Sequence, residues 1–138
     1  MKTVLLLLLG ALSLFTNLVR ADDKPAPVAA NSKDYRNVGV DEFDKLRVEK
    51  VNVVLDVRTA KEFAAGHIES AVNIDWNGPD FEKQAGTLDK SKTYLVHCAG
   101  GVRSAKASDK LTSLKFKSVV NLEGGLKAWE KAGKPVVK

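Results

Sequence analysis

The stretch that decides the fold runs from Thr93 to Ser104 and reads TYLVHCAGGVRS. Its first part, Thr93 to His97, is rich in β-branched and aromatic side chains, which is typical of a buried strand. The paired glycines Gly100 and Gly101 then permit a tight turn, and apolar residues at helical spacing follow from about Arg103. The stretch therefore predicts a strand, a short loop and a helix, with the single cysteine of the chain between strand and loop.

Strand and helix signals alternate along the rest of the chain. The predicted strands are 51–57, 71–74, 93–97 and 119–122, and the predicted helices cover 41–46, 59–65, 81–85, a segment from about 103, and the surroundings of 126–129. Such alternation predicts parallel pairing through right-handed crossovers. We expect an α/β three-layer sandwich, in which helices flank a central, mainly parallel sheet of about five strands. Ligands in such sheets bind beyond the carboxyl ends of the strands.

The first 21 residues have the pattern of a secretory signal peptide. A positively charged start precedes an apolar run from Val4 to Phe15, and small residues stand before the expected cleavage site. The run is shorter than the ~18 residues that a membrane span needs, so no stable membrane anchor is expected. We predict a signal peptide (1–21), a flexible leader (22–34) and one domain (35–138), in a protein that is exported to the periplasm, or secreted if its source has a single membrane.

The composition excludes several classes of function. The hydrophobic share is 44% and the charged share 28%, which is typical of a globular domain. The lysines are scattered without interleaved aromatic residues, so a nucleic acid is not an expected partner. One cysteine and two histidines cannot form an internal disulfide or a metal site of the usual kind. No dinucleotide or phosphate-loop motif is present, and no cofactor is expected.

The position of Cys98 favours a nucleophile over an inert buried cysteine. The loop amides after it and the amino end of the following helix together form a site for a negative charge. Both effects lower the pKa of a thiol, so we expect Cys98 to be a thiolate near neutral pH. A cysteine in the middle of a strand would instead indicate a packing role.

Several motifs in a fixed order resemble one family. They are Val54-Leu55-Asp56-Val57-Arg58, Glu62-Phe63, Gly66-His67-Ile68, Ala71-Val72-Asn73-Ile74, the Cys98 loop, and Asn121-Leu122-Glu123-Gly124-Gly125 with Trp129. Together they look like a rhodanese domain, and the resemblance extends from about Val38 to Pro135. A single motif of this kind would be weak evidence, whereas the ordered set is specific.

The resemblance implies a thiosulfate sulfurtransferase-type enzyme that works through a persulfide on Cys98. The partners would be a small anionic sulfur donor such as thiosulfate and an acceptor, either cyanide or a thiol, with a protein as a further candidate acceptor. The implied substrate-binding residues are those of the loop and the first helical turn: Ala99, Gly100, Gly101, Val102, Arg103 and Ser104. In the family, an arginine at the place of Arg103 helps to hold donor oxygens.

Three further residues are expected to support the site. Asp56 is predicted to accept hydrogen bonds from the loop, mainly as a structural group. Arg58 is predicted to form a surface pair with Glu62 at the entry of the following helix. His67 is predicted to be a hydrogen-bonded structural histidine, and the side chain of His97 to lie on the face of the sheet opposite to Cys98.

Two pairs of small residues, in the Cys98 loop and later in the chain, lead to further predictions. Ala99 and Gly100 depart from many rhodanese domains, which place a charged or bulky residue after the cysteine, so the pocket is expected to be open and only modestly adapted to thiosulfate. Gly124 and Gly125 are interpreted first as a place of close backbone packing and second as part of the pocket wall.

Two other functions remain open at this stage. The pattern His-Cys-x-x-Gly-x-Arg-Ser is similar to the signature of cysteine phosphatases and arsenate reductases, but phosphatases have five residues between the cysteine and the arginine, and this chain has four. The other alternative is a persulfide carrier or interaction module that presents sulfur to a partner protein, because the same cysteine would serve both roles.

Overall fold

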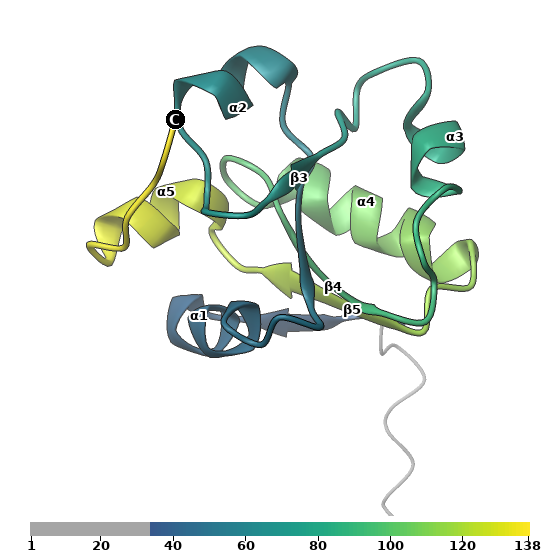
Figure 1. Ribbon diagram of the computed structural model, residues 1–138, viewed down its shortest axis with the longest axis horizontal. Helices are drawn as coiled ribbons and strands as arrows, with labels where there is room; N and C mark the ends of the chain where they lie inside the picture. The colour runs from purple at the N-terminus through teal and green to yellow at the C-terminus, as the bar shows by residue number, and fades with distance from the viewer. Residues whose placement is uncertain (1–33) are drawn as a thin grey trace, which may run out of the picture. The chain divides into compact units, whose positions relative to one another are not determined.

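The computed structural model describes residues 34–138 (Figure 1). The predicted signal peptide and all but the last residue of the predicted leader lie outside the described residues. The elements in chain order are β1 (Arg36–Val38), α1 (Val40–Arg47), β2 (Val53–Asp56), α2 (Ala60–Ala65), β3 (Val72–Asn73), α3 (Phe81–Ala85), β4 (Thr93–His97), α4 (Val102–Ser113), β5 (Ser118–Leu122) and α5 (Gly125–Lys131). No helix among the described residues is long and apolar enough to cross a membrane.

The five strands form one sheet in the order β1-β5-β4-β2-β3, and every neighbouring pair is parallel. This confirms the predicted α/β fold with a parallel sheet. Asp56 at the end of β2 lies opposite His97 at the end of β4, so the residues that follow these strands share one edge of the sheet. The sequence analysis missed β1 and predicted a longer β3, because edge strands of three and two residues carry almost no periodic signal.

Helices cover both faces of the sheet (Figure 1). The side chains of β4 alternate between these two faces. Val96 and Cys98 belong to the core cluster that includes residues of α3 and α4, whereas Leu95 belongs to the cluster that includes residues of α1 and α5. His97 is fully buried on the second face, where its ring packs edge-on against Phe43 at a centroid distance of 6.3 Å. The predicted orientation of His97, opposite to Cys98, is therefore confirmed.

A buried ion pair lies where β2 passes into α2. The Arg58 side chain donates to both carboxylate oxygens of Asp56, with the shortest contact at 2.7 Å, and the Arg58 amide donates to the same carboxylate at 3.0 Å. The same guanidinium reaches the carbonyls of Glu62 and Gly66. The predicted surface pair between Arg58 and the Glu62 carboxylate is wrong, because Arg58 is only 5% exposed and takes the buried carboxylate two residues earlier. The carboxylate of Glu62 binds Arg103 instead.

We expect Asp56→Asn to lower the free energy of unfolding by about 3 kcal/mol, because the buried guanidinium of Arg58 would lose its counter-charge. The matched control is Glu42→Gln, which removes the charge of a carboxylate in a solvent-exposed pair with Arg36 and should cost less than about 1 kcal/mol. Urea denaturation followed by circular dichroism measures both. Equal losses for the two variants would show that the Asp56–Arg58 pair adds no more stability than a surface pair.

Candidate active site

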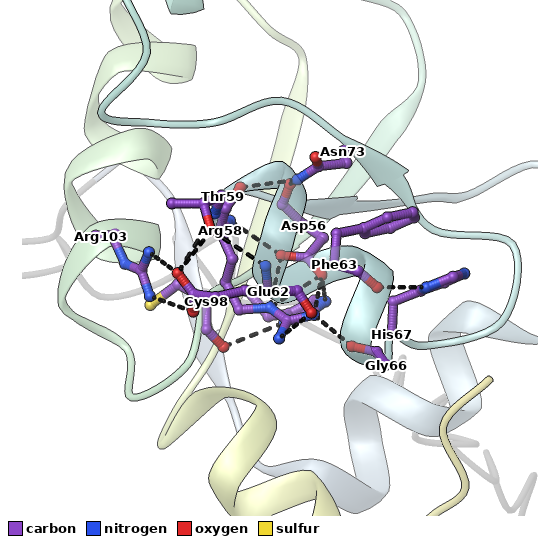
Figure 2. Close-up of polar contacts among 11 residues, drawn as sticks. Asp56, Arg58, Thr59, Glu62, Phe63, Gly66, His67, Asn73, Cys98 and Arg103 are labelled. Carbon is purple, nitrogen blue, oxygen red and sulfur yellow. Dashed lines mark hydrogen bonds and ion pairs between the residues drawn. The ribbon is translucent and has the colours of Figure 1, made fainter. Parts of the chain in front are cut away.

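Cys98 lies immediately after β4, at the edge of the sheet where the chain turns into α4 (Figure 2). The backbone N–H of Gly101 donates a hydrogen bond to the Cys98 sulfur at 3.0 Å. Gly101 has a φ of 107°, a left-handed conformation that side-chain-bearing residues rarely adopt, and it caps the amino end of α4. The glycine therefore permits the tight return of the loop onto the sulfur.

Hydrogen-bond donors surround the Cys98 sulfur. Burial has the largest single effect on this thiol and raises the pKa of Cys98, but the hydroxyl and amide of Ser104 and the amides of Gly101 and Gly100 together lower the pKa below its ordinary value. Hydrogen bonds to a charged acceptor favour the charged form. The site therefore stabilises a thiolate, which is the nucleophilic form of cysteine.

The Ser104 hydroxyl has one proton and two acceptors within reach. The Gly101 carbonyl lies 3.2 Å from the hydroxyl oxygen, and the same hydroxyl acts on the Cys98 sulfur. Because a negatively charged acceptor forms the stronger hydrogen bond, the proton should turn to the sulfur when the thiol ionises. Ser104 is fully buried, so water does not compete for this proton.

The amino end of α5 holds the peptide planes of the loop. The amide of Leu126 donates to the Cys98 carbonyl at 2.8 Å, and the amide of Lys127 donates to the Ala99 carbonyl at 3.0 Å. In a trans peptide the C=O and the following N–H point in opposite directions, so the bond to the Ala99 carbonyl turns the Gly100 amide toward the sulfur.

This contact leaves no room for a side chain at Gly125. A Cβ built there would lie 2.6 Å from the Cys98 carbonyl oxygen and 2.7 Å from the Ala99 carbonyl carbon. Gly125 also has a φ of 60°. The predicted close backbone packing is therefore confirmed at Gly125, and it occurs against the loop that carries Cys98.

Arg103 lies in the first turn of α4 and forms a two-point ion pair with Glu62 of α2 (Figure 2). Its Nη1 is 2.8 Å from Oε1 and its Nη2 is 3.0 Å from Oε2. The hydrogen bond with Arg103 is the main cause that lowers the pKa of Glu62, to about 2, so this carboxylate is charged throughout the neutral range. The structure also contains a capping box between Thr59 and Glu62. The sequence analysis paired Glu62 with Arg58 and missed its contact with Arg103.

The other predicted site residues fall into two groups. Gly100 and Val102 are exposed at the surface of the loop, and Ala99 is half-buried. Asp56, Arg58 and His67 are not among the donors to the sulfur: the first two form the buried ion pair where β2 passes into α2. The Asp56 carboxylate accepts hydrogen bonds from the amide and the side chain of Arg58. These bonds take the place of the hydrogen bonds that were expected from the Cys98 loop.

His67 follows α2 and has a structural role, because it contacts this helix. Its Nδ1 lies 2.9 Å from the Phe63 carbonyl oxygen, and its ring stacks on that of Phe63 at a centroid distance of 3.8 Å. Its backbone pairs with Val137 near the end of the chain. The predicted hydrogen-bonded histidine thus fastens α2 and the C-terminal segment. Within residues 34–138, no three His, Cys, Asp or Glu side chains are placed to hold a metal ion.

We expect Gly125→Ala to lower the reactivity of the Cys98 thiol. Gly133→Ala is the matched control. Gly133 also has a positive φ, 75°, but a Cβ there meets nothing within 4 Å. Both variants should lose about 1 kcal/mol of stability through backbone strain, while the clash at Gly125 should add ~1–3 kcal/mol. Only Gly125→Ala should slow the alkylation of Cys98 by iodoacetamide near neutral pH, by about tenfold, which corresponds to ~1.4 kcal/mol. Equal alkylation rates in the two variants would show that Gly125 does not affect the reactivity of Cys98.

Removal of the Ser104 hydroxyl should raise the pKa of Cys98. Because the thiolate is the reactive form, the rate of iodoacetamide alkylation rises with pH through this pKa, and Ser104→Ala should move the midpoint to higher pH. Near neutrality the rate should fall by about tenfold, since a hydrogen bond to a charged group contributes ~1.5 kcal/mol or more. Ser113→Ala removes an exposed hydroxyl at the other end of α4 and should leave the midpoint unchanged. A midpoint that stays in place in Ser104→Ala would contradict the role of this hydroxyl.

Comparison with known proteins agrees with the motifs in the sequence. The Rhodanese-like domain family matches residues 39–132. Thiosulfate sulfurtransferase 18 of Arabidopsis thaliana is 34% identical over 115 residues, which cover 74% of this chain and 85% of that protein. The tRNA uridine(34) hydroxylase of Pelagibacter ubique (strain HTCC1062) is 33% identical over 111 residues, which cover 78% of this chain but only 37% of that protein. The crystal structure of a rhodanese-related protein from Thermoplasma volcanium superposes with a TM-score of 0.67 at 34% identity and covers 75% of this chain and 98% of its own. The chain therefore belongs to the rhodanese-like domain family.

Proposed function

We propose that this protein is a sulfurtransferase that moves sulfane sulfur from a small donor such as thiosulfate to a thiophilic acceptor, cyanide or a thiol, through a persulfide on Cys98. The observation that carries the proposal is the set of amide and hydroxyl donors directed at the Cys98 sulfur. A relative of similar length bears the name of a thiosulfate sulfurtransferase. Another relative bears the name of a tRNA hydroxylase, so the family alone does not identify the reaction.

In the first half of the cycle, the Cys98 thiolate attacks the outer sulfur of thiosulfate. The S–S bond of the donor breaks, sulfite leaves with the bonding electron pair, and the enzyme holds Cys98–S–S⁻. The charge is conserved, because a thiolate and a dianion give a persulfide anion and a dianion. The amides that stabilise the thiolate can then stabilise the persulfide anion.

In the second half, cyanide or a thiolate attacks the outer sulfur and the Cys98 thiolate leaves. A thiol with a lowered pKa is a better leaving group in such an exchange. The same hydrogen bonds therefore assist both halves: they supply the nucleophile in the first and stabilise the leaving group in the second. This is double-displacement covalent catalysis.

A donor must reach the sulfur through the surface of the loop, because Cys98 itself is only 1% exposed. Gly100 is exposed, and a Cβ built there meets no atom within 4 Å, so solvent reaches a residue whose own amide contacts the sulfur. We infer that donors approach beside Gly100, where the missing side chain leaves space.

Two alternatives are less well supported. In the phosphatase-like alternative, the arginine would clamp a phosphate, whereas both terminal nitrogens of Arg103 already bind Glu62. In the carrier alternative, the persulfide forms but is released only to a partner protein, and the turnover rate distinguishes it from an enzyme. We also propose that the protein acts after export, on the strength of the signal-peptide pattern in residues 1–21.

The test is mass analysis of the intact protein after incubation with thiosulfate. The wild-type protein should gain one sulfur atom and lose it when cyanide is added, whereas Cys98→Ser should gain none because its hydroxyl is not a comparable nucleophile. Steady formation of thiocyanate supports an enzyme, while a stable persulfide with negligible turnover supports the carrier. A wild-type protein that takes up no sulfur, or a Cys98→Ser variant with activity within about tenfold of it, would overturn the proposal.

A further inference from the structure

The guanidinium of Arg103 is held in an ion pair with Glu62. The two side chains are 23% and 35% exposed, so the pair lies at the surface of the site. Two parallel N–H···O bonds at 2.8 and 3.0 Å fix the guanidinium in one orientation. Glu62 is itself fixed, because its carboxylate also accepts from Thr59 at the start of α2.

The charges around Arg103 are mainly negative. The hydrogen bond with Glu62 is the largest effect that raises the pKa of Arg103, and the charges of Glu62, Cys98 and Asp75 raise it further. One guanidinium is thus paired with the Glu62 carboxylate and lies in the field of a second carboxylate, Asp75, and of the Cys98 thiolate when it forms. A dianion that approaches Cys98 therefore meets a positive charge that is already neutralised, although the chain as a whole has a formal charge of +5.

We propose that Glu62 is a specificity-determining residue, which selects against doubly charged sulfur donors by holding the positive charge of Arg103 in a two-point ion pair. The favoured donors are organic sulfane compounds with no more than one negative charge, such as thiosulfonates and persulfides. This inference rests on the proposed function, because it concerns the donor half of the Cys98 cycle.

A pair of donors that differ in charge and little else makes the idea measurable. Thiosulfate and methanethiosulfonate carry the same transferable sulfur on an SO₂ group, and a methyl group in the second replaces one O⁻ of the first. With methanethiosulfonate, the Cys98 thiolate attacks the terminal sulfur, the S–S bond breaks, and methanesulfinate leaves with the electron pair. One thiolate and one monoanion give a persulfide anion and a monoanion, so atoms and charge balance.

Glu62→Gln is a conservative probe of the charge. Glutamine also serves at the third position of a capping box, so the contact with Thr59 and the start of α2 should persist while the negative charge is lost. Arg103 would then have a positive charge without a counter-charge on α2. The variant should raise kcat/KM for thiosulfate by about tenfold, mainly through a lower KM, and change kcat/KM for methanethiosulfonate by less than about threefold.

Arg103→Ala should have the opposite effect. It leaves Glu62 and Asp75 without the guanidinium, so kcat/KM for thiosulfate should fall by about tenfold or more, with a smaller loss for methanethiosulfonate. Because the two donors have different leaving groups, the measured quantity is the change in their ratio between variants. Opposite changes in the Glu62 and Arg103 variants would support a charge effect over a general disturbance of the site.

Two controls separate charge from structure. Thr59→Ala removes the hydroxyl contact with Glu62 but keeps the backbone contact, the Glu62 charge and its two bonds to Arg103, so it should leave the donor ratio unchanged. Glu42→Gln removes a paired carboxylate on α1, which packs on the opposite face of the sheet from α4, and should also leave the ratio unchanged. A ratio that shifts as much in Thr59→Ala as in Glu62→Gln would attribute the effect to the helix and overturn the inference.

The outcomes also distinguish this inference from the proposed function. If neither donor places sulfur on Cys98 in the wild-type protein, the proposed function fails, and the inference fails with it. If both donors label Cys98 in the wild type but Glu62→Gln leaves their ratio unchanged, the sulfurtransferase function stands and the role of Glu62 is refuted.

Discussion

The arrangement around Cys98 depends on the hydrogen bonds between the start of α5 and the carbonyls of Cys98 and Ala99. These bonds fix the peptide planes of a loop that contains two glycines and would otherwise have many conformations. With the Ala99 carbonyl directed at α5, the Gly100 amide on the other side of the same peptide plane faces the sulfur. The close approach requires Gly125, since any side chain there would overlap the loop backbone. Gly125 is far from Cys98 in the sequence, but the thiolate depends on it as much as on Gly100 and Gly101 beside the cysteine.

A second set of contacts runs through the short helix α2, which has no fully buried residue of its own. Polar groups hold it in place instead. The guanidinium of Arg58 binds the Gly66 carbonyl at its end, and His67 binds the carbonyl of Phe63 within it. Glu62 joins this helix to α4 through Arg103. Because Arg58 is also bound to Asp56 inside the sheet, the buried ion pair that stabilises the fold and the exposed pair beside Cys98 are connected through the same helix.

Much of this architecture is encoded in short-range patterns, and such patterns were sufficient to predict it. The strand, loop and helix around Cys98 follow from β-branched residues, paired glycines and helical spacing, and the capping box of Thr59 and Glu62 is likewise a local signal. The partner of Arg58 could not be predicted in this way. Two carboxylates, Asp56 and Glu62, lie at similar distance along the chain, and only burial decides between them.

The contact between Glu62 and Arg103 was missed for a related reason. It joins residues 41 positions apart, and it exists because α2 and α4 begin at the same edge of the sheet. The crossovers of a parallel sheet bring such helix starts together, so the fold predicts the neighbourhood but not the pairing. The roles of the loop residues as substrate contacts stay predictions, since geometry alone shows donors and charges and not the molecule that meets them.

Membership of the rhodanese-like family indicates the nucleophile and the groups that hold it more firmly than it indicates a substrate. The same domain corresponds to about a third of a protein named as a tRNA hydroxylase and to most of one named as a thiosulfate sulfurtransferase, so membership of the family does not by itself identify the reaction. In this chain the residues after the cysteine, Ala99 and Gly100, are small. The positive charge of Arg103 is nearly neutralised by the negative charge of Glu62. A thiolate in such a place depends on directed amides, with little help from an excess of positive charge. Amide dipoles stabilise a sulfur anion at short range, but they do little to attract a distant dianion. For the sulfurtransferase that we propose, this separation of the two tasks is the physical basis of a preference among sulfur donors.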